Sequence, residues 1–203
     1  MNYLIKNGQV FDGSGAPGIS ADVRVREQKI AEIGPQLAAQ DEEVVDASGL
    51  LVVPGLVDLH VHVYSGMGTW AIDPADAGLK TGVTTMLDTG TAGSLTYRTF
   101  HRFVMPPAQE DIFALLNVSM IGCLQGHPDS PPVMGELNDV RYADVPSAVA
   151  CIEAHRDRII GVKTRLSTSL ADRCRENEEA GLRAAREVAE RTGTFFMVHH
   201  AAS

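Results

Sequence analysis

The sequence is poor in cysteine and in positive charge, and each shortage excludes a class of protein. Its three cysteines, Cys123, Cys151 and Cys174, are too few and too far apart for a disulfide framework or a C-x-x-C metal site. We therefore expect a reduced, cytoplasmic setting. Lysine and arginine number 17 against 26 acidic residues, which gives a net charge of −9. This balance argues against nucleic-acid binding, because phosphate contacts need clustered basic side chains.

Long apolar runs are also missing. No segment approaches the roughly 20 apolar residues of a membrane span, and the N-terminus lacks the apolar run of a signal peptide. Hydrophobic residues still make up 44% of the 203 residues, which is ordinary for a globular protein. We expect a globular protein that binds neither membrane nor nucleic acid.

Residues 1–53 have the pattern of short strands and turns. The pair Asn7-Gly8 is a strong hairpin-turn signal and predicts that one strand ends there and another begins. Residues 21–26 alternate apolar and charged side chains, as a half-buried strand does. We predict a small β-sandwich portion over residues 1–53.

Residues 54–203 alternate apolar strands with helical stretches, which is the βαβ pattern of a parallel sheet in an α/β protein. The loop at 120–140, with three prolines, is long enough to be a lid. The predicted strands are 56–63, 83–88, 112–119, 159–166 and 194–200, and the predicted helices lie near 74–80, 95–104, 146–156 and 178–191.

Five strands are too few for a closed (β/α) barrel, which needs eight. The first and last strands would then be unpaired apolar edges. We expect an incomplete TIM (β/α) barrel that is a fragment, a truncated gene product or half of a split protein. An ordinary open α/β sheet is the alternative.

The stretch Pro-Gly-Leu-Val-Asp-Leu-His-Val-His at 54–62 carries the strongest functional signal. A strand places alternate side chains on one face, so Asp58, His60 and His62 point the same way. Their apolar neighbours point the other way, into packing: Val57, Leu59, Val61 and Val63. Two neighbouring imidazoles are half of a transition-metal site. Two unrelated histidines on a half-exposed strand are the simpler alternative.

Later strands carry further candidates. Lys163 lies in the middle of an apolar strand and must be paired, solvated or modified, because burying a bare ammonium is costly. Taken alone, it and Arg165 share a face and are most simply solvated. His199 and His200 end the last strand, and only one of them can face the barrel interior, because adjacent side chains point opposite ways.

Residues 54–62 resemble the metal-binding signature of the amidohydrolase superfamily at every position. The resemblance implies one or two divalent metals, commonly zinc, at the C-terminal ends of the barrel strands, and hydrolysis of a C–N or ester bond. The stretch Gly161-Val162-Lys163-Thr164-Arg165 is similar to a strand of the amidohydrolase/deacetylase subgroup. In many members of the superfamily the strand-4 lysine is carboxylated by CO₂, and the carbamate bridges two metals. The implied ligands are His60, His62, carboxylated Lys163 and His199.

The resemblance also covers residues around these ligands. Asp88, Gly90 and Gly93 match an Asp-x-Gly-x-x-Gly turn, in which the aspartate ties the loop backbone by hydrogen bonds. Asp58 fits a role in supporting the ligands. The candidates for the pocket or its support are Asp58, Tyr64, Asp88, Asn117 and Arg165.

Three functions remain open. The first is a deacetylase-type hydrolase that acts on a small acylated compound. A dihydroorotase-like cyclic amidohydrolase is disfavoured, because its motif continues H-x-H-x-Arg where this chain has Tyr64. The third is a non-catalytic, degenerate scaffold. In the superfamily an aspartate of strand 8 moves the proton and a histidine of strand 6 binds the second metal. We therefore assign no catalytic residue, and we expect a homo-oligomer or a complementing C-terminal fragment as partner.

Overall fold

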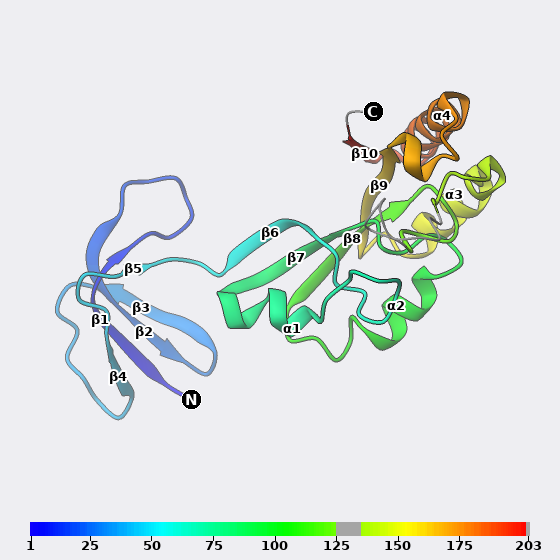
Figure 1. Ribbon diagram of the computed structural model, residues 1–203. Helices are drawn as coiled ribbons and strands as arrows, with labels where there is room; N and C mark the ends of the chain where they lie inside the picture. Colours follow the sequence, from blue (N-terminus) through cyan, green and yellow to red (C-terminus); the bar gives the residue numbers. More distant parts are fainter. Residues whose placement is uncertain (125–134, 202–203) are drawn as a thin grey trace. The chain divides into compact units, whose positions relative to one another are not determined.

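The computed structural model describes residues 1–124 and 135–201, which form two compact units, Met1–Leu56 and Val57–Ser203 (Figure 1). The centre of the predicted lid, residues 125–134, lies outside the described residues. Within the described ranges, no helix has the length and apolarity needed to cross a bilayer.

The first unit is a five-stranded β-sheet with a small apolar core of Val10, Ala21 and Val23. Strand β1 pairs antiparallel with β2 and parallel with β4 and β5, and β2 pairs antiparallel with β3. The strands are β1 (Tyr3–Val10), β2 (Ile19–Arg26), β3 (Lys29–Gly34), β4 (Glu43–Asp46) and β5 (Leu51–Val52).

The hairpin turn predicted at Asn7-Gly8 was wrong, because β1 continues through both residues. The pairing with β2 shifts register between Ile5 and Gly8, which marks a β-bulge. Asn7 takes a φ of 63°, a left-handed conformation that asparagine tolerates, and its N–H donates to Oδ1 of Asp22 at 2.9 Å. A bulge and a tight turn both require such a residue, so the dipeptide alone does not distinguish them.

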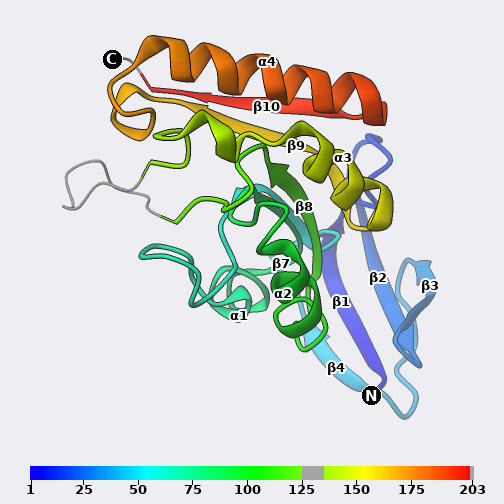
Figure 2. The same cartoon turned by 90° about the vertical axis from the view of Figure 1, so that its right-hand side faces the viewer.

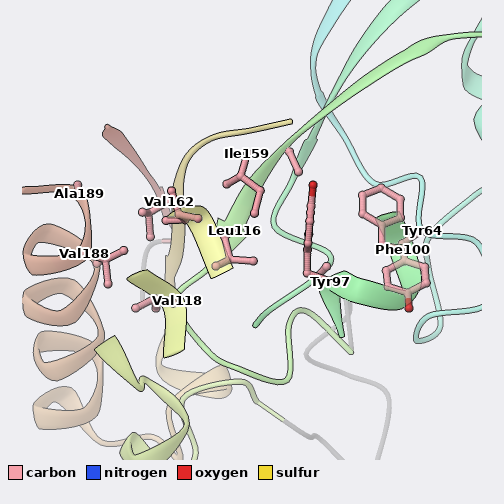
Figure 3. Close-up of a cluster of buried hydrophobic side chains, with 14 of the residues drawn as sticks. Tyr64, Tyr97, Phe100, Leu116, Val118, Ile159, Val162, Val188 and Ala189 are labelled. Carbon is pink, nitrogen blue, oxygen red and sulfur yellow. The ribbon is translucent and has the colours of Figure 1, made fainter. Parts of the chain in front are cut away.

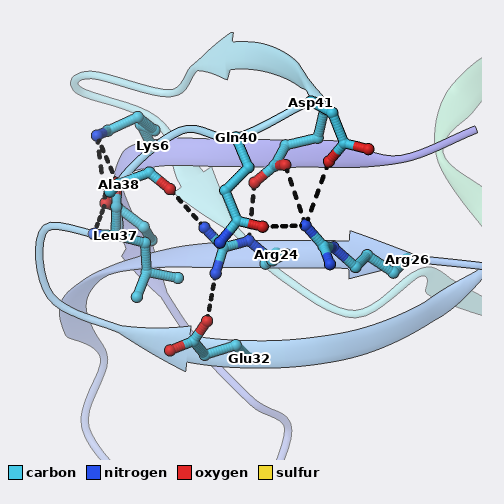
Figure 4. Close-up of polar contacts among 10 residues, drawn as sticks. Lys6, Arg24, Arg26, Glu32, Leu37, Ala38, Gln40 and Asp41 are labelled. Carbon is cyan, nitrogen blue, oxygen red and sulfur yellow. Dashed lines mark hydrogen bonds and ion pairs between the residues drawn. The ribbon is translucent and has the colours of Figure 1, made fainter.

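A buried arginine fastens the loop after β3 to this sheet. Nε of Arg24 donates to Oε1 of Glu42 at 2.7 Å, and its Nη2 donates to the carbonyl of Ala38 at 2.6 Å. Arg24 also pairs with Glu32 (Figure 4). The hydrogen bond from Arg24 lowers the pKa of Glu42 to about 2.

The second unit is a curled five-stranded sheet in the order β10-β9-β8-β7-β6, with a helical connection between successive strands (Figure 1). The pairs β7–β8, β8–β9 and β9–β10 are parallel. The strands are β6 (Leu56–Val61), β7 (Val83–Thr89), β8 (Asp111–Asn117), β9 (Ile159–Leu166) and β10 (Phe195–His200), and the α-helices are α1 (Pro74–Ala77), α2 (Tyr97–Phe103), α3 (Val145–Ala154) and α4 (Arg175–Thr192).

Helices cover one face of this sheet, and α4 runs alongside β9 and β10 (Figure 2). The core joins Val162 of β9 to Val188 of α4, and it continues to Phe100 of α2 (Figure 3). Successive strand residues point to opposite faces, so Lys163 points away from the helices. The opposite, concave face of the half-barrel therefore carries the polar strand residues.

The edge strand β6 corrects one expectation about apolar packing. Val61 and Val63 are buried, as predicted, but Val57 and Leu59 are 58% and 66% exposed. Because β6 ends the sheet, the first half of the strand lacks the neighbour that would bury these side chains.

Candidate functional site

Lys163 is the most unusual residue on the concave face. It is 1% exposed, and among the described residues its amine has one hydrogen-bond acceptor, Sδ of Met197 at 3.2 Å. A thioether is a weak acceptor and carries no charge. Burial lowers the pKa of the Lys163 amine to about 8. Within the described part of the chain, no anion is hydrogen-bonded to this amine, and its lowered pKa increases the fraction of the neutral, nucleophilic form.

Gly90 leaves the space that the Lys163 side chain occupies. A Cβ on Gly90 would lie 2.7 Å from both Cβ and Cγ of Lys163, and Gly90 has a φ of 97°. The buried side chain of Asn117 fixes this turn, because its Nδ2 donates to the Gly90 carbonyl at 3.1 Å. Asn117 therefore supports the wall of the site through the backbone.

His60 and His62 follow each other on one face at the end of β6. Their ring centroids lie 5.7 Å apart in an edge-on arrangement, and Trp70 packs on His62 with a centroid separation of 4.0 Å. Burial lowers the pKa of His62 to about 3, and the charges of His60 and Lys163 add to the effect. The neutral imidazole that results is the form that binds metals.

His199 of β10 belongs to the same electrostatic environment. It pairs in register with Arg165, and Met197 pairs with Lys163. Burial lowers the pKa of His199, and the charges of Lys163 and Arg165 lower it further. Burial also lowers the pKa of His60, followed by the charges of Lys163 and His199. Besides burial, the charges of Lys163 on β9 and His199 on β10 thus both lower the pKa of His60 on β6.

The donor set fits a metal only when Lys163 is included. Among residues 1–124 and 135–201, no group of three or more His, Cys, Asp and Glu side chains is arranged to hold an ion. Neutral imidazoles together with anionic oxygen are typical zinc ligands. A carbamate on Lys163 would supply that oxygen, so the donors present match a divalent metal in chemical type once the lysine is carboxylated.

A buried ion pair next to Lys163 was missed by the sequence analysis. Glu136 is 1% exposed and holds Arg165 in a two-pronged pair, with Nη2 and Oε2 at 2.5 Å. The Arg165 guanidinium lies 5.6 Å from the centre of the Trp70 ring. Glu136 lies in the loop predicted as a lid, so its place in the sequence offered no reason to assign it to the site. A buried arginine such as Arg165 requires an acidic partner, and this requirement was the signal in the sequence that a carboxylate lies nearby.

The aspartates of β6 and β7, Asp58 and Asp88, both accept hydrogen bonds from backbone N–H groups. Asp88 is fully buried and accepts the N–H groups of Val63, Gly90 and Thr91, at 2.9, 3.2 and 2.8 Å. Oδ1 of Asp58 accepts the N–H of His60 at 2.9 Å. Asp88 therefore ties the loop after β7 to the end of β6, which is the role expected for an aspartate in this turn.

The structure corrects the interpretation of Tyr64 as a pocket residue. Tyr64 is 7% exposed, its ring stacks on Phe100 of α2 at 4.8 Å, and its hydroxyl donates to the Thr96 carbonyl at 3.2 Å. The side chain following the H-x-H pair is therefore part of the hydrophobic core (Figure 3).

A curled parallel sheet, with helices on one face and polar strand ends on the other, resembles half of a (β/α) barrel. Residues 51–203 match the amidohydrolase family. A deacetylase from Agrobacterium fabrum is 34% identical over 157 residues, which cover 76% of this chain and 37% of the relative. The chain belongs to the amidohydrolase family.

Solved structures agree with this assignment. A dihydroorotase matches with a TM-score of 0.85 at 26% identity, over 98% of this chain and 50% of that chain. An N-acyl-D-glutamate deacylase from Bordetella bronchiseptica, complexed with zinc and a phosphonate inhibitor, shares the fold, with a TM-score of 0.57 at 20% identity over 97% of this chain and 44% of that one. The chain spans half or less of the length of these proteins.

Proposed function

We propose that these residues build part of the active site of a metal-dependent hydrolase of the deacetylase type, which cleaves an amide or ester bond of a small acylated compound. One observation carries the proposal. In the part of the chain that the structure describes, Lys163 is buried with no anion hydrogen-bonded to its amine, and burial together with the charge of Lys163 lowers the pKa values of three imidazoles. The 34% identity to a deacetylase supports the reaction type.

The ligands in this proposal are His60, His62, His199 and Lys163, and the cofactor is a pair of zinc ions. The neutral Lys163 nitrogen attacks CO₂: an N–C bond forms, one C–O π bond breaks, and one proton leaves to solvent. The product is a carbamate whose single negative charge is shared by two oxygens. When bound, two divalent ions lower the pKa of a water molecule and polarise the carbonyl of the substrate. The negative carbamate also removes the cost of a buried positive charge at this position.

The remaining residues of the site hold these ligands in place. Gly90 leaves room for the Lys163 stem, and Asp58 holds the backbone of His60. The pair of Arg165 and Glu136 neutralises two buried charges next to the site. A residue that moves the proton to the leaving group is not assigned among the described side chains.

A dihydroorotase-like cyclic amidohydrolase is the second candidate, favoured by the TM-score of 0.85 to a dihydroorotase. The arginine position of that family's motif is Tyr64 here, and Tyr64 is in the core. The two candidates differ in substrate. The deacetylase function predicts release of acetate from N-acetyl amino acids or acetate esters, and the second predicts ring opening of dihydroorotate.

We also propose that further β/α units pair with the two edges of the sheet, in a longer polypeptide or in a separate chain. Leu59 on β6 is 66% exposed, and Phe195 and Phe196 on β10 are 50% and 37% exposed. Apolar edge strands are templates for pairing. Light scattering on the purified chain tests this surface. We expect self-association that is weakened in Leu59→Lys, and a wild type that stays monomeric would contradict the claim that these edges are pairing surfaces.

A ¹³C NMR spectrum of the chain, recorded with zinc and ¹³C-bicarbonate, tests the proposed site. We expect a carbamate carbon signal that is absent from Lys163→Met and retained in Lys80→Met, since Lys80 is an exposed lysine paired with Asp76. If the chain hydrolyses either candidate substrate, removing zinc with a chelator should abolish this hydrolysis, and adding zinc should restore it. A chain that holds neither zinc nor carbamate would support the non-catalytic scaffold instead.

A further inference from the structure

A threonine hydroxyl lies between the His62 imidazole and the Asp88 carboxylate. Oγ1 of Thr91 is 2.7 Å from Nδ1 of His62 and 2.8 Å from Oδ2 of Asp88. Thr91 and Asp88 are both fully buried, so these two contacts are made away from solvent. The three residues form a continuous chain of hydrogen bonds from β7 to the end of β6.

The direction of each hydrogen bond follows from counting protons. A hydroxyl carries one hydrogen and two acceptor lone pairs. Burial raises the pKa of Asp88, whereas the N–H groups of Val63, Gly90 and Thr91 that it accepts lower it and stabilise the carboxylate. The carboxylate accepts hydrogen bonds without donating any. The Thr91 hydrogen is therefore directed to Asp88, as the geometry indicates. The Thr91 oxygen is left as an acceptor, and His62 Nδ1 must be the donor.

We propose that Asp88 and Thr91 are positioning residues that hold His62 in the tautomer protonated at Nδ1. Nε2 then carries the lone pair. Oγ1 of Thr89 lies 3.4 Å from Nε2 and can donate its hydrogen to that lone pair, so a ligand at Nε2 would take the place of this long hydrogen bond. The ring of Trp70, packed on the imidazole at 4.0 Å, restricts rotation away from this orientation. The consequence for metal binding rests on the proposed function, but the tautomer itself is a property of the metal-free chain.

His60 gives an internal comparison. Its backbone N–H is held by Asp58, but among the described residues its ring makes no hydrogen bond. A neutral histidine ring without a partner favours the tautomer protonated at Nε2 in water. The two histidines of the H-x-H pair should therefore differ in tautomer, with His62 held by the protein and His60 set by solvent.

Two-bond ¹H–¹⁵N correlation spectra of the metal-free, full chain test the tautomer, at a pH of about 8, which lies above the ordinary histidine pKa. We expect the His62 pattern of a ring protonated at Nδ1 in the wild type and in Thr91→Ser. Thr91→Val should lose this pattern, while its backbone bonds and overall fold, followed by the amide spectrum, persist. A His62 ring protonated at Nε2 in the wild type would overturn the proposal, as would an unchanged pattern in Thr91→Val.

Zinc affinity separates this proposal from the proposed function. Groups that orient a metal-binding histidine typically change metal affinity by about 10–100-fold when they are removed. We expect a loss of that size in Thr91→Val and recovery in Thr91→Ser. If the tautomer is as stated but the wild type binds no zinc, the positioning chain stands and the metal function fails. If zinc binds equally to wild type and Thr91→Val, the positioning role is overturned and the metal function stands.

Discussion

Replacing Gly90 with alanine tests whether the glycine exists to accommodate Lys163. Two effects should add. An L-residue in a left-handed conformation costs roughly 1–2 kcal/mol, and Gly90 has a φ of 97°. The new Cβ would also lie 2.7 Å from Cβ and Cγ of Lys163, and forcing a methyl group into a packed site typically costs about 1–3 kcal/mol. We expect Gly90→Ala to lower the free energy of unfolding by about 2–5 kcal/mol.

Gly66→Ala is the matched control in the same unit. Gly66 has a φ of 83°, and a Cβ there would meet no atom within 4 Å. This variant should lose only the conformational part, about 1–2 kcal/mol. The difference between the two variants isolates the clash with Lys163.

Urea unfolding followed by tryptophan fluorescence measures both variants. Trp70 is the single tryptophan of the chain and lies in the second unit, so its signal reports that unit. Equal losses in the two variants would refute the argument, because the Lys163 contact would then contribute nothing. Zinc affinity should fall in Gly90→Ala and stay unchanged in Gly66→Ala.

Two further substitutions address the charges of the fold. Glu136→Gln removes the carboxylate that pairs with Arg165, and breaking a buried pair costs about 3–5 kcal/mol. The exposed pair of α4, tested with Glu187→Gln, should cost at most about 1 kcal/mol in the same urea assay; similar losses would contradict the burial argument. In the first unit, the Arg24 hydrogen bond lowers the pKa of Glu42 from 4.5 to about 2. This contribution to stability is present above pH 4.5 and is lost as the pH falls toward 2. Glu42→Gln should remove that pH dependence, measured by amide hydrogen exchange, and the exposed Glu43→Gln should retain it.

The strands of the second unit could be predicted because their apolar runs are bounded by clear turn signals. The predicted strand 159–166 coincides with β9, and the predicted helix 178–191 lies within α4. Asp73 caps α1 in the predicted helix region 74–80, and its Oδ1 accepts the N–H of Ala75 at 2.9 Å. Local patterns were sufficient wherever the decisive contacts are close in sequence.

The incorrect or missed predictions share a cause, because each of these residues is placed by a contact with a residue that is distant in the sequence. Asn7 forms a bulge because Asp22 and the continuing β2 hold the strand, and the dipeptide carries no trace of either. Tyr64 turns to the core because Phe100 of α2 offers a stacking partner. The position of Glu136 depends on Arg165, 29 residues away in the sequence. Residues from separate segments meet only after the sheet has formed, so periodicity alone could not pair them.

The central claim is that side chains from β6, β9 and β10 share a divalent metal, and the neighbouring histidines of β10 test it most directly. Zinc bound per chain is measured after equilibrium dialysis for the wild type, His199→Asn and His200→Asn. We predict that the wild type and His200→Asn retain stoichiometric zinc and that His199→Asn loses it. A wild type without zinc, or a His199→Asn variant that binds as much zinc as the wild type, would contradict the account.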